Sequence, residues 1–277
     1  MPISAYVPCF NNASTLASAV NSLRQQSVPI NELFVIDDCS ADNSCEIAQD
    51  LGVRIVRQER NSGRGAVRSR AMLEAVHDFV LSCDATNALP PDFVERALPW
   101  FESATVAAVF GRMWQEDNST VVQRWRGRHL FKTHDQPVAN RRASLATWGV
   151  LMRKSCVMNV GNFDANLRHS EDADLGERLL ADGYEVVFDP LLHTIPLTSN
   201  TLPELLERYW RWYAGKDEKI GWKGYFKQVV YSLKVMARQD LQAGDLLSIP
   251  ISVLSPHYQF WKSFWRKLPK KTINEVA

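Results

Sequence analysis

The sequence predicts an α/β protein, in which a mostly parallel sheet is flanked by helices and followed by a helical, aromatic and basic C-terminal tail. Short apolar runs alternate with helical patterns through the first ninety residues, as in a parallel sheet with helical crossovers. Polar residues follow these apolar runs, at the sheet edge where such folds bind ligands. Apolar residues make up 45% and charged residues 23% of the 277 residues, which excludes a largely disordered chain.

The first ninety residues contain the most regular part of this pattern. The predicted strands are 3–7, 33–36, 53–56 and 79–81. The predicted helices are one that begins after Asn11 or Asn12, one over 40–51 that ends at Gly52, and one over 65–77. Together these elements predict the parallel half of the sheet.

After residue 105 the pattern is less regular. We expect strands at 106–110, 146–152 and 186–188 and helices over 174–181 and 205–213. Residues 114–137 have the composition of a long connection with basic side chains.

Charge divides the chain unevenly. The net charge of +1 shows no basic excess, so we expect no nucleic-acid partner. Residues 205–277 carry 13 Lys and Arg against 6 Asp and Glu, whereas residues 1–204 have a net charge of −6. We therefore expect a domain over 1–204 and a functionally distinct helical extension over 205–277.

The cysteines and the termini indicate the compartment. The five cysteines are odd in number, widely spaced and without a C-x-x-C pair, so we expect neither a disulfide framework nor a zinc site. The first residues lack the basic start and apolar stretch of a signal peptide. The uncharged run 246–261 is too short, and too broken by two prolines, to span a bilayer. We expect a cytoplasmic protein.

Polar clusters follow four of the predicted strands. They are Asn11-Asn12, Asp37-Asp38, 61–64 and Asp84. A carboxylate at 37 or 38 could accept the ring N–H of a nucleotide base, and the backbone of the turn around Arg64, between two glycines, could meet a phosphate. The alternative is that these are ordinary polar loops.

Segments along the chain, including these polar clusters, resemble the motifs of glycosyltransferase family 2 in the order in which the family has them. The segments are 7–12, 22–27, 35–42, 61–68, 84–87 with 91–92, 161–164, 171–175 and 208–212. The resemblance covers about residues 1–215. It implies a GT-A type, Rossmann-like fold and an inverting hexosyltransferase that uses a nucleotide-diphospho-sugar.

By this resemblance, Asp38 contacts the base of the donor. The remaining donor-binding residues that it implies are Pro8, Phe10, Asn12, Asp37, Asn61, Gly63, Arg64, Arg68, Asp84 and Thr86. The alternative for Asp38 is a charge at a helix N-terminus, which stabilises by about 0.3–1 kcal/mol. The alternative for Arg68 is a surface cation.

The sequence departs from the family at Asp84-Ala85-Thr86, where the family has Asp-x-Asp. In the family motif the two carboxylates bind a divalent cation, Mg²⁺ or Mn²⁺. In this chain Thr86 stands at the second position, and its hydroxyl does not supply the second negative charge. The resemblance also implies a metal contact from His193, for which the alternative is a structural histidine. We therefore leave open whether a divalent cation takes part.

The resemblance makes Asp172 the catalytic base and Glu171 the residue that orients it or the acceptor. The alternative is that both acids only stabilise a helix N-terminus. Arg208 to Trp212 resembles the Gln-x-x-Arg-Trp motif of processive members, with Arg208 in place of Gln. Arg208, Arg211 and Trp212 would then contact the diphosphate and acceptor, with Trp148 as a further stacking residue, unless these aromatics pack in the core.

The function that we expect is inverting transfer of a sugar from a UDP-linked donor to a glycan or lipid-linked acceptor. One alternative is a degenerate relative that binds nucleotide sugar or glycan without catalysis. A nucleotidyltransferase is disfavoured because 8–12 is not a glycine-rich basic loop.

The tail places aromatic residues among basic ones, which is typical of segments that lie at a bilayer surface. The residues are Trp222, Tyr225, Phe226, Trp261, Phe264 and Trp265, with Lys262, Arg266, Lys267, Lys270 and Lys271. We expect it to bind an anionic membrane at the inner face of the cell membrane. The alternative is packing on the domain or an oligomer contact.

Overall fold

The computed structural model describes residues 1–213 and 220–265, and it divides the chain into two compact units. The first unit comprises 1–114 and 135–198, and the second comprises 115–134 and 199–277. The second unit thus takes in the helical extension expected over 205–277 and, in addition, the segment expected as a connection. Arg266, Lys267, Lys270 and Lys271 lie outside the described residues.

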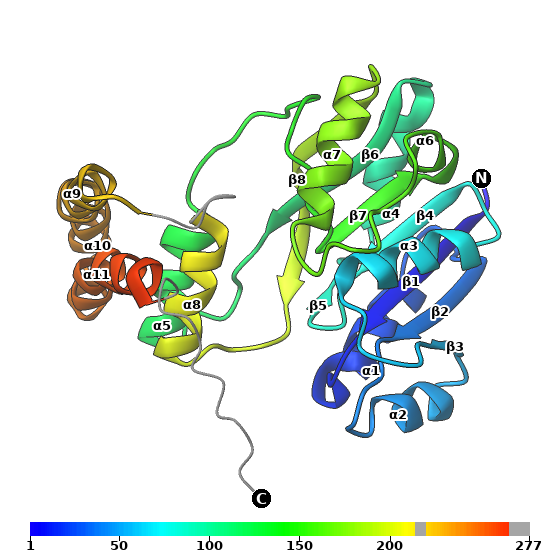
Figure 1. Ribbon diagram of the computed structural model, residues 1–277, viewed down its shortest axis with the longest axis horizontal. Helices are drawn as coiled ribbons and strands as arrows, with labels where there is room; N and C mark the ends of the chain where they lie inside the picture. Colours follow the sequence, from blue (N-terminus) through cyan, green and yellow to red (C-terminus); the bar gives the residue numbers. More distant parts are fainter. Residues whose placement is uncertain (214–219, 266–277) are drawn as a thin grey trace, which may run out of the picture. The chain divides into compact units, whose positions relative to one another are not determined.

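The first unit is built on a mostly parallel sheet (Figure 1). Its strands are β1 (Ile3–Cys9), β2 (Glu32–Asp37), β3 (Arg54–Arg57), β4 (Phe79–Cys83), β5 (Asn87–Ala88), β6 (Val106–Met113), β7 (Gly149–Arg153) and β8 (Glu185–Pro196). Their order in the sheet is β3-β2-β1-β4-β7-β6-β8-β5. Strand β7 runs antiparallel to β4 and β6, and β5 runs antiparallel to β8, whereas the other pairs are parallel. The predicted α/β class is confirmed.

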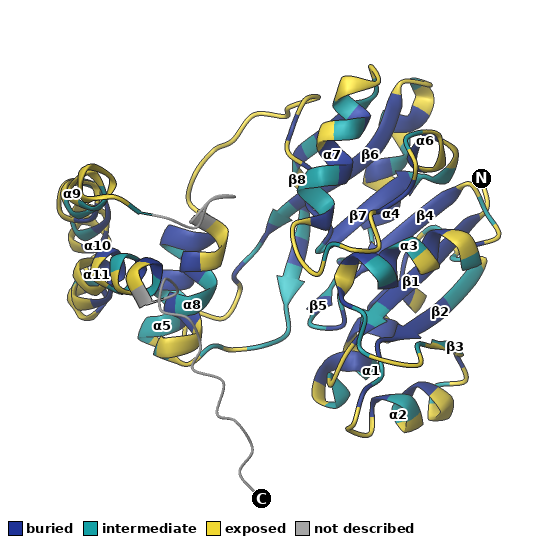
Figure 2. Ribbon diagram, in the orientation of Figure 1, coloured by how far each residue is buried: buried dark blue, intermediate teal, exposed yellow. Residues whose placement is uncertain are grey.

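Helices cover both faces of the sheet, so its strands are buried on both sides. Helices α1 (Ala13–Arg24), α2 (Ser44–Asp50) and α4 (Phe93–Ala97) contribute to one apolar core, and α3 (Arg64–Glu74), α6 (Lys154–Asn159) and α7 (Glu171–Ala181) contribute to the other. Along β1, Ala5 and Val7 face the first core and Tyr6 faces the second. Figure 2 shows the consequence, with buried central strands and helices exposed on their outer sides.

The second unit consists of helices. Among the described residues they are α5 (Val121–Trp125) with a π-helical turn (Arg126–Leu130), α8 (Leu202–Tyr213), α9 (Trp222–Tyr231) with a π-helical turn (Ser232–Met236), α10 (Ala237–Gln242), a 3₁₀ helix (Leu246–Ser248) and α11 (Ile249–Trp265). Buried Asp240 accepts hydrogen bonds from Arg128 (2.5 Å) and Ser252 (2.6 Å). Because Arg128 lies in 115–134 and Ser252 lies in α11, this buried network joins the two stretches of chain that form the second unit. No helix in 1–213 or 220–265 is long and apolar enough to cross a membrane.

Candidate active site

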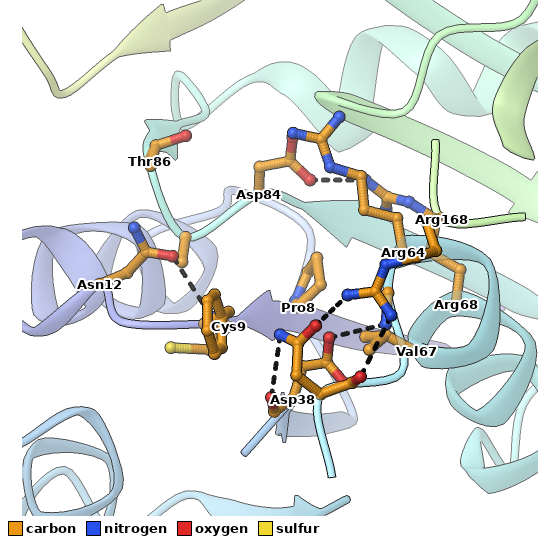
Figure 3. Close-up of a pocket in the computed structure, with 14 residues that line it drawn as sticks. Pro8, Cys9, Asn12, Asp38, Arg64, Val67, Arg68, Asp84, Thr86 and Arg168 are labelled. Atoms are coloured by element: carbon orange, nitrogen blue, oxygen red, sulfur yellow. Dashed lines mark hydrogen bonds and ion pairs between the residues drawn. The ribbon is translucent and has the colours of Figure 1, made fainter. Parts of the chain in front are cut away.

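A pocket of about 430 Å³ opens at the carboxyl ends of β1 and β4 in the first unit (Figure 3). Ten of the residues that line it were expected from the sequence to bind the donor. They are Pro8, Phe10, Asn12, Asp38, Asn61, Gly63, Arg64, Arg68, Asp84 and Thr86. The structure therefore brings most of the expected donor-binding residues together, as the convergence of parallel strand ends requires.

Asp38 anchors the loop that precedes α3. Its carboxylate accepts hydrogen bonds from the backbone N–H groups of Ser62 (2.7 Å) and Gly63 (2.9 Å). Gly63 has φ of +90°, a backbone conformation that favours glycine. Asp37, which we expected beside Asp38 in the donor site, is instead buried, does not line the pocket and accepts a hydrogen bond from the Ser40 N–H (3.1 Å). Asp37 therefore shapes the loop, and Asp38 reaches the pocket.

Arg68 lies at the centre of a buried network of charges. Its Nε donates to Glu171 Oε1 (3.0 Å), its Nη2 to Asp84 Oδ1 (2.6 Å) and its Nη1 to Ser82 Oγ (2.8 Å). Burial lowers the pKa of Arg68, but the carboxylates of Asp84 and Glu171 outweigh it and raise the pKa above its ordinary value. With only 2% of its surface exposed, Arg68 is not a surface cation.

Asp172 lies in the first turn of α7, next to Glu171. The turn is entered through Ser170, whose φ is +62°. Asp172 accepts hydrogen bonds from the Ala173 N–H (2.9 Å) and the Thr147 hydroxyl (3.5 Å). Burial, and then the neighbouring charge of Glu171, raise the pKa of Asp172 above that of an ordinary aspartate. A carboxylate of raised pKa is a stronger base once it is ionised.

The residues of the expected metal site do not form a set of ligands for a resident cation. Asp84 and Thr86 both line the pocket, but Asp84 Oδ1 is already in an ion pair with Arg68. His193, on β8, stacks on Trp114 with ring centroids 4.5 Å apart. Burial, and then Arg112, lower the pKa of His193. Within the described part of the chain, no group of three or more His, Cys, Asp or Glu could hold a metal.

The expected acceptor residues lie in different parts of the chain. Half-buried Trp148 precedes β7, and its indole N–H donates to the Gly111 carbonyl (3.0 Å). Arg208, Arg211 and Trp212 belong to α8 in the second unit. The guanidinium of Arg208 lies 5.4 Å from the centroid of the Trp212 ring. Their contacts with an acceptor or a diphosphate stay predictions.

Arg168 lines the pocket and was missed from the sequence. It precedes α7 and donates to the Asn61 carbonyl (3.2 Å) and to Asn61 Oδ1. The loop that carries it packs on the turn before α3, where the Gly65 N–H donates to the Leu167 carbonyl (2.9 Å). A Cβ at Gly65 would lie 2.2 Å from the Asp164 carbonyl oxygen, so only glycine permits this approach. The contact joins residues a hundred positions apart, and no local pattern signals it.

The family model for glycosyl transferase family 2 matches residues 4–167. The chain belongs to glycosyl transferase family 2. It is 27% identical over 211 residues to the succinoglycan biosynthesis protein ExoA of Rhizobium meliloti, a match that covers 69% of this chain and 64% of ExoA. It is 23% identical over 228 residues to the poly-β-1,6-N-acetyl-D-glucosamine synthase of Staphylococcus epidermidis, covering 79% of this chain and 55% of the synthase. The chain thus spans less than two thirds of the length of these family 2 relatives.

Solved structures show the same fold. The chain matches residues 1–349 of TarS from S. aureus with a TM-score of 0.56 and 19% identity, over 95% of this chain and 88% of TarS. It matches the mannosyltransferase PcManGT from Pyrobaculum calidifontis, solved with GDP-Man and Mn²⁺, with a TM-score of 0.63 and 14% identity, over 96% of this chain and 88% of PcManGT. The predicted family and the GT-A type fold are therefore confirmed.

Proposed function

We propose that this family 2 protein is an inverting hexosyltransferase that moves a sugar from a UDP-linked donor to a hydroxyl of a glycan or lipid-linked acceptor. The observation that carries the proposal is the buried network of Asp84, Arg68 and Glu171. It connects the pocket to the turn that presents Asp172. The names of the polysaccharide-forming relatives, and the TarS structure in complex with UDP-GlcNAc, support this donor and acceptor class.

In the proposed reaction the acceptor oxygen forms a bond to the anomeric carbon while the bond from that carbon to the diphosphate breaks. Asp172 accepts the proton of the acceptor hydroxyl, and its raised pKa makes it an effective base. Basic side chains that line the pocket offset the negative charge that develops on the departing diphosphate.

Glu171 acts as a positioning residue in this proposal. Its side chain is only 2% exposed and binds Arg68, which leaves it no direct access to an acceptor. It would therefore orient Arg68 and raise the pKa of Asp172 through its charge.

The alternative is a relative that binds a nucleotide sugar without transferring it. This alternative arises because Thr86 replaces the second acid of the Asp-x-Asp motif. The raised pKa of half-buried Asp172 favours catalysis, because carboxylates whose pKa is shifted by burial and by a neighbouring charge are typical of catalytic sites.

We further propose that the second unit binds the anionic inner face of the cell membrane. On α9, the large apolar side chains Trp222 and Phe226 are 66% and 61% exposed, and Val230 continues their stripe at the same spacing. Lys223 and Lys227 are exposed one position further along. Exposed aromatics with adjacent lysines match the headgroup region of an anionic bilayer, where each basic residue contributes about 1 kcal/mol.

The donor assignment is tested by incubating the protein with single nucleotide sugars and measuring nucleotide release and thermal stabilisation. We expect a UDP-sugar to do both, and Asp38→Ala to weaken both. A donor at 100 times its Kd should stabilise the folded protein by about 2.7 kcal/mol. Stabilisation without release or transfer for any acceptor would support the binding relative instead. No response to any nucleotide sugar would contradict the proposal.

A further inference from the structure

The charges of the pocket point to a diphosphate-binding site formed by Arg64 and Arg168, whose guanidinium groups take the place of a resident divalent cation. This inference rests on the proposed function, because it specifies how the same pocket holds the diphosphate of a nucleotide.

The pocket is lined by more positive than negative side chains, namely Arg64, Arg68 and Arg168 against Asp38 and Asp84. Arg68 is already neutralised by Asp84 (2.6 Å) and by Glu171 (3.0 Å) from outside the lining. Asp38 accepts two backbone N–H groups. The positive charge that remains for a ligand therefore belongs to Arg64 and Arg168.

Neither of these two arginines forms an ion pair with a carboxylate within the described residues. The hydrogen bonds of Arg168 go to the two carbonyl oxygens of Asn61, which are neutral acceptors. The side chain of Arg64 is exposed and takes part in no ion pair with a described residue. Both side chains line the same pocket, and neither is paired there with a carboxylate of the described residues (Figure 3).

Arg168 is also held in place before a ligand arrives. Its Cα and Cγ would each lie 3.0 Å from a Cβ added at Gly63, so it packs closely on that glycine. Asn61, its hydrogen-bond partner, belongs to the same loop, and Asp38 fixes that loop through the Gly63 N–H. A guanidinium ordered in advance loses less conformational entropy when it binds phosphate oxygens, and its planar donors suit them.

The acidic side of the pocket does not match a resident cation. Asp84 is the one carboxylate at the position of the Asp-x-Asp motif, and its Oδ1 is engaged by Arg68. Thr86 lines the pocket with a neutral hydroxyl in place of the second acid. The pocket thus has one acid fewer than the Asp-x-Asp motif supplies for a cation. The fixed charges of Arg64 and Arg168 take the place of the metal charge.

Calorimetric titration of the whole protein with UDP, GDP and uridine, in EDTA and in Mn²⁺, tests this inference. We expect UDP to bind in EDTA within about threefold of its affinity in Mn²⁺. Arg168→Gln should weaken UDP binding by about 10- to 100-fold, the range for one charge-assisted hydrogen bond. The same variant should leave uridine binding unchanged, which also shows that the pocket remains folded. Arg60→Gln, at an exposed arginine of the same loop outside the pocket lining, is the matched control.

The outcomes separate this inference from the proposed function. UDP or GDP binding that requires Mn²⁺, or an Arg168→Gln variant that behaves as Arg60→Gln does, would overturn the arginine site and leave the transferase proposal standing. Failure of both nucleotides to bind in either buffer would contradict the transferase proposal itself. Thr86→Asp provides the converse experiment, since it should make UDP affinity increase with Mn²⁺.

Discussion

Replacement of Glu171 by glutamine tests the buried charge network on which the site depends. Glu171 is 2% exposed, and its Oε1 accepts from Arg68 Nε at 3.0 Å. Removing one partner of a buried ion pair costs about 3–5 kcal/mol when the other charge is left uncompensated. In Glu171→Gln the amide oxygen still accepts the hydrogen bond, and Asp84 still pairs with Arg68. The loss is then the difference between a charge-assisted and a neutral hydrogen bond, about 1–2 kcal/mol.

Urea unfolding of the parent, Glu171→Gln and Glu171→Ala measures this difference. We expect Glu171→Ala to lose about 3–5 kcal/mol of unfolding free energy, because it removes both the charge and the acceptor. The matched control is Asp174→Asn, which breaks a half-exposed i,i+4 pair with Arg178 on the same helix and should cost at most about 0.5 kcal/mol. If Glu171→Gln and Asp174→Asn lose the same small amount, the buried network does not stabilise the site as argued.

Three further predictions concern packing, pH and membranes. Gly65→Ala should cost about 1–3 kcal/mol in urea unfolding because its Cβ meets the Asp164 carbonyl. Gly224→Ala, within α9, should stabilise by up to about 1 kcal/mol, because its Cβ would lie at an ordinary contact distance of 3.5 Å from Ile220 Cγ2. The raised pKa of Asp172 predicts that kcat/KM falls on the acid side at a pH above that of an ordinary aspartate. The raised pKa also predicts that the stability which Asp172 contributes is lost as the pH rises through that pKa, so the free energy of unfolding falls there. Asp172→Asn should not show this fall. The protein should co-sediment with anionic vesicles, and the bound fraction should fall as salt is added and in the double variant Trp222→Ser/Lys223→Gln. A parent protein that stays in the supernatant at low salt contradicts the membrane proposal.

Strands β1, β2 and β4 and helix α1 could be predicted because each has apolar residues buried on one or both faces and ends at residues that break the pattern. Strand β1 shows why, since Ala5 and Val7 face one core and Tyr6 the other. The start of α7 could not be read from apolar periodicity, because its first turn holds acids that belong to the site. The helix was therefore predicted from 174, although it begins at Glu171.

Two other features were not predicted from the sequence. Helix α5 is five residues long and begins at a capping box between Thr120 and Gln123, too short to show a helical period in the segment expected as a connection. Arg168 enters the pocket because Gly65 allows two loops to approach each other, and neither residue signals the other locally. The loop residues after β1, β2 and β4 could be predicted because parallel strands bring their ends to one edge.

Transfer by Asp172→Asn tests the central claim most directly. Asparagine keeps the size of the side chain and an oxygen that can accept the Ala173 N–H, but it cannot take the proton of the acceptor. With the donor found by screening, we expect the transfer rate to fall by about 10²–10⁴-fold while donor affinity stays nearly unchanged. Asp174→Asn, two residues along the same helix, should transfer at close to the parent rate. Transfer by Asp172→Asn at more than about a tenth of the parent rate would contradict the assignment of Asp172 as the base.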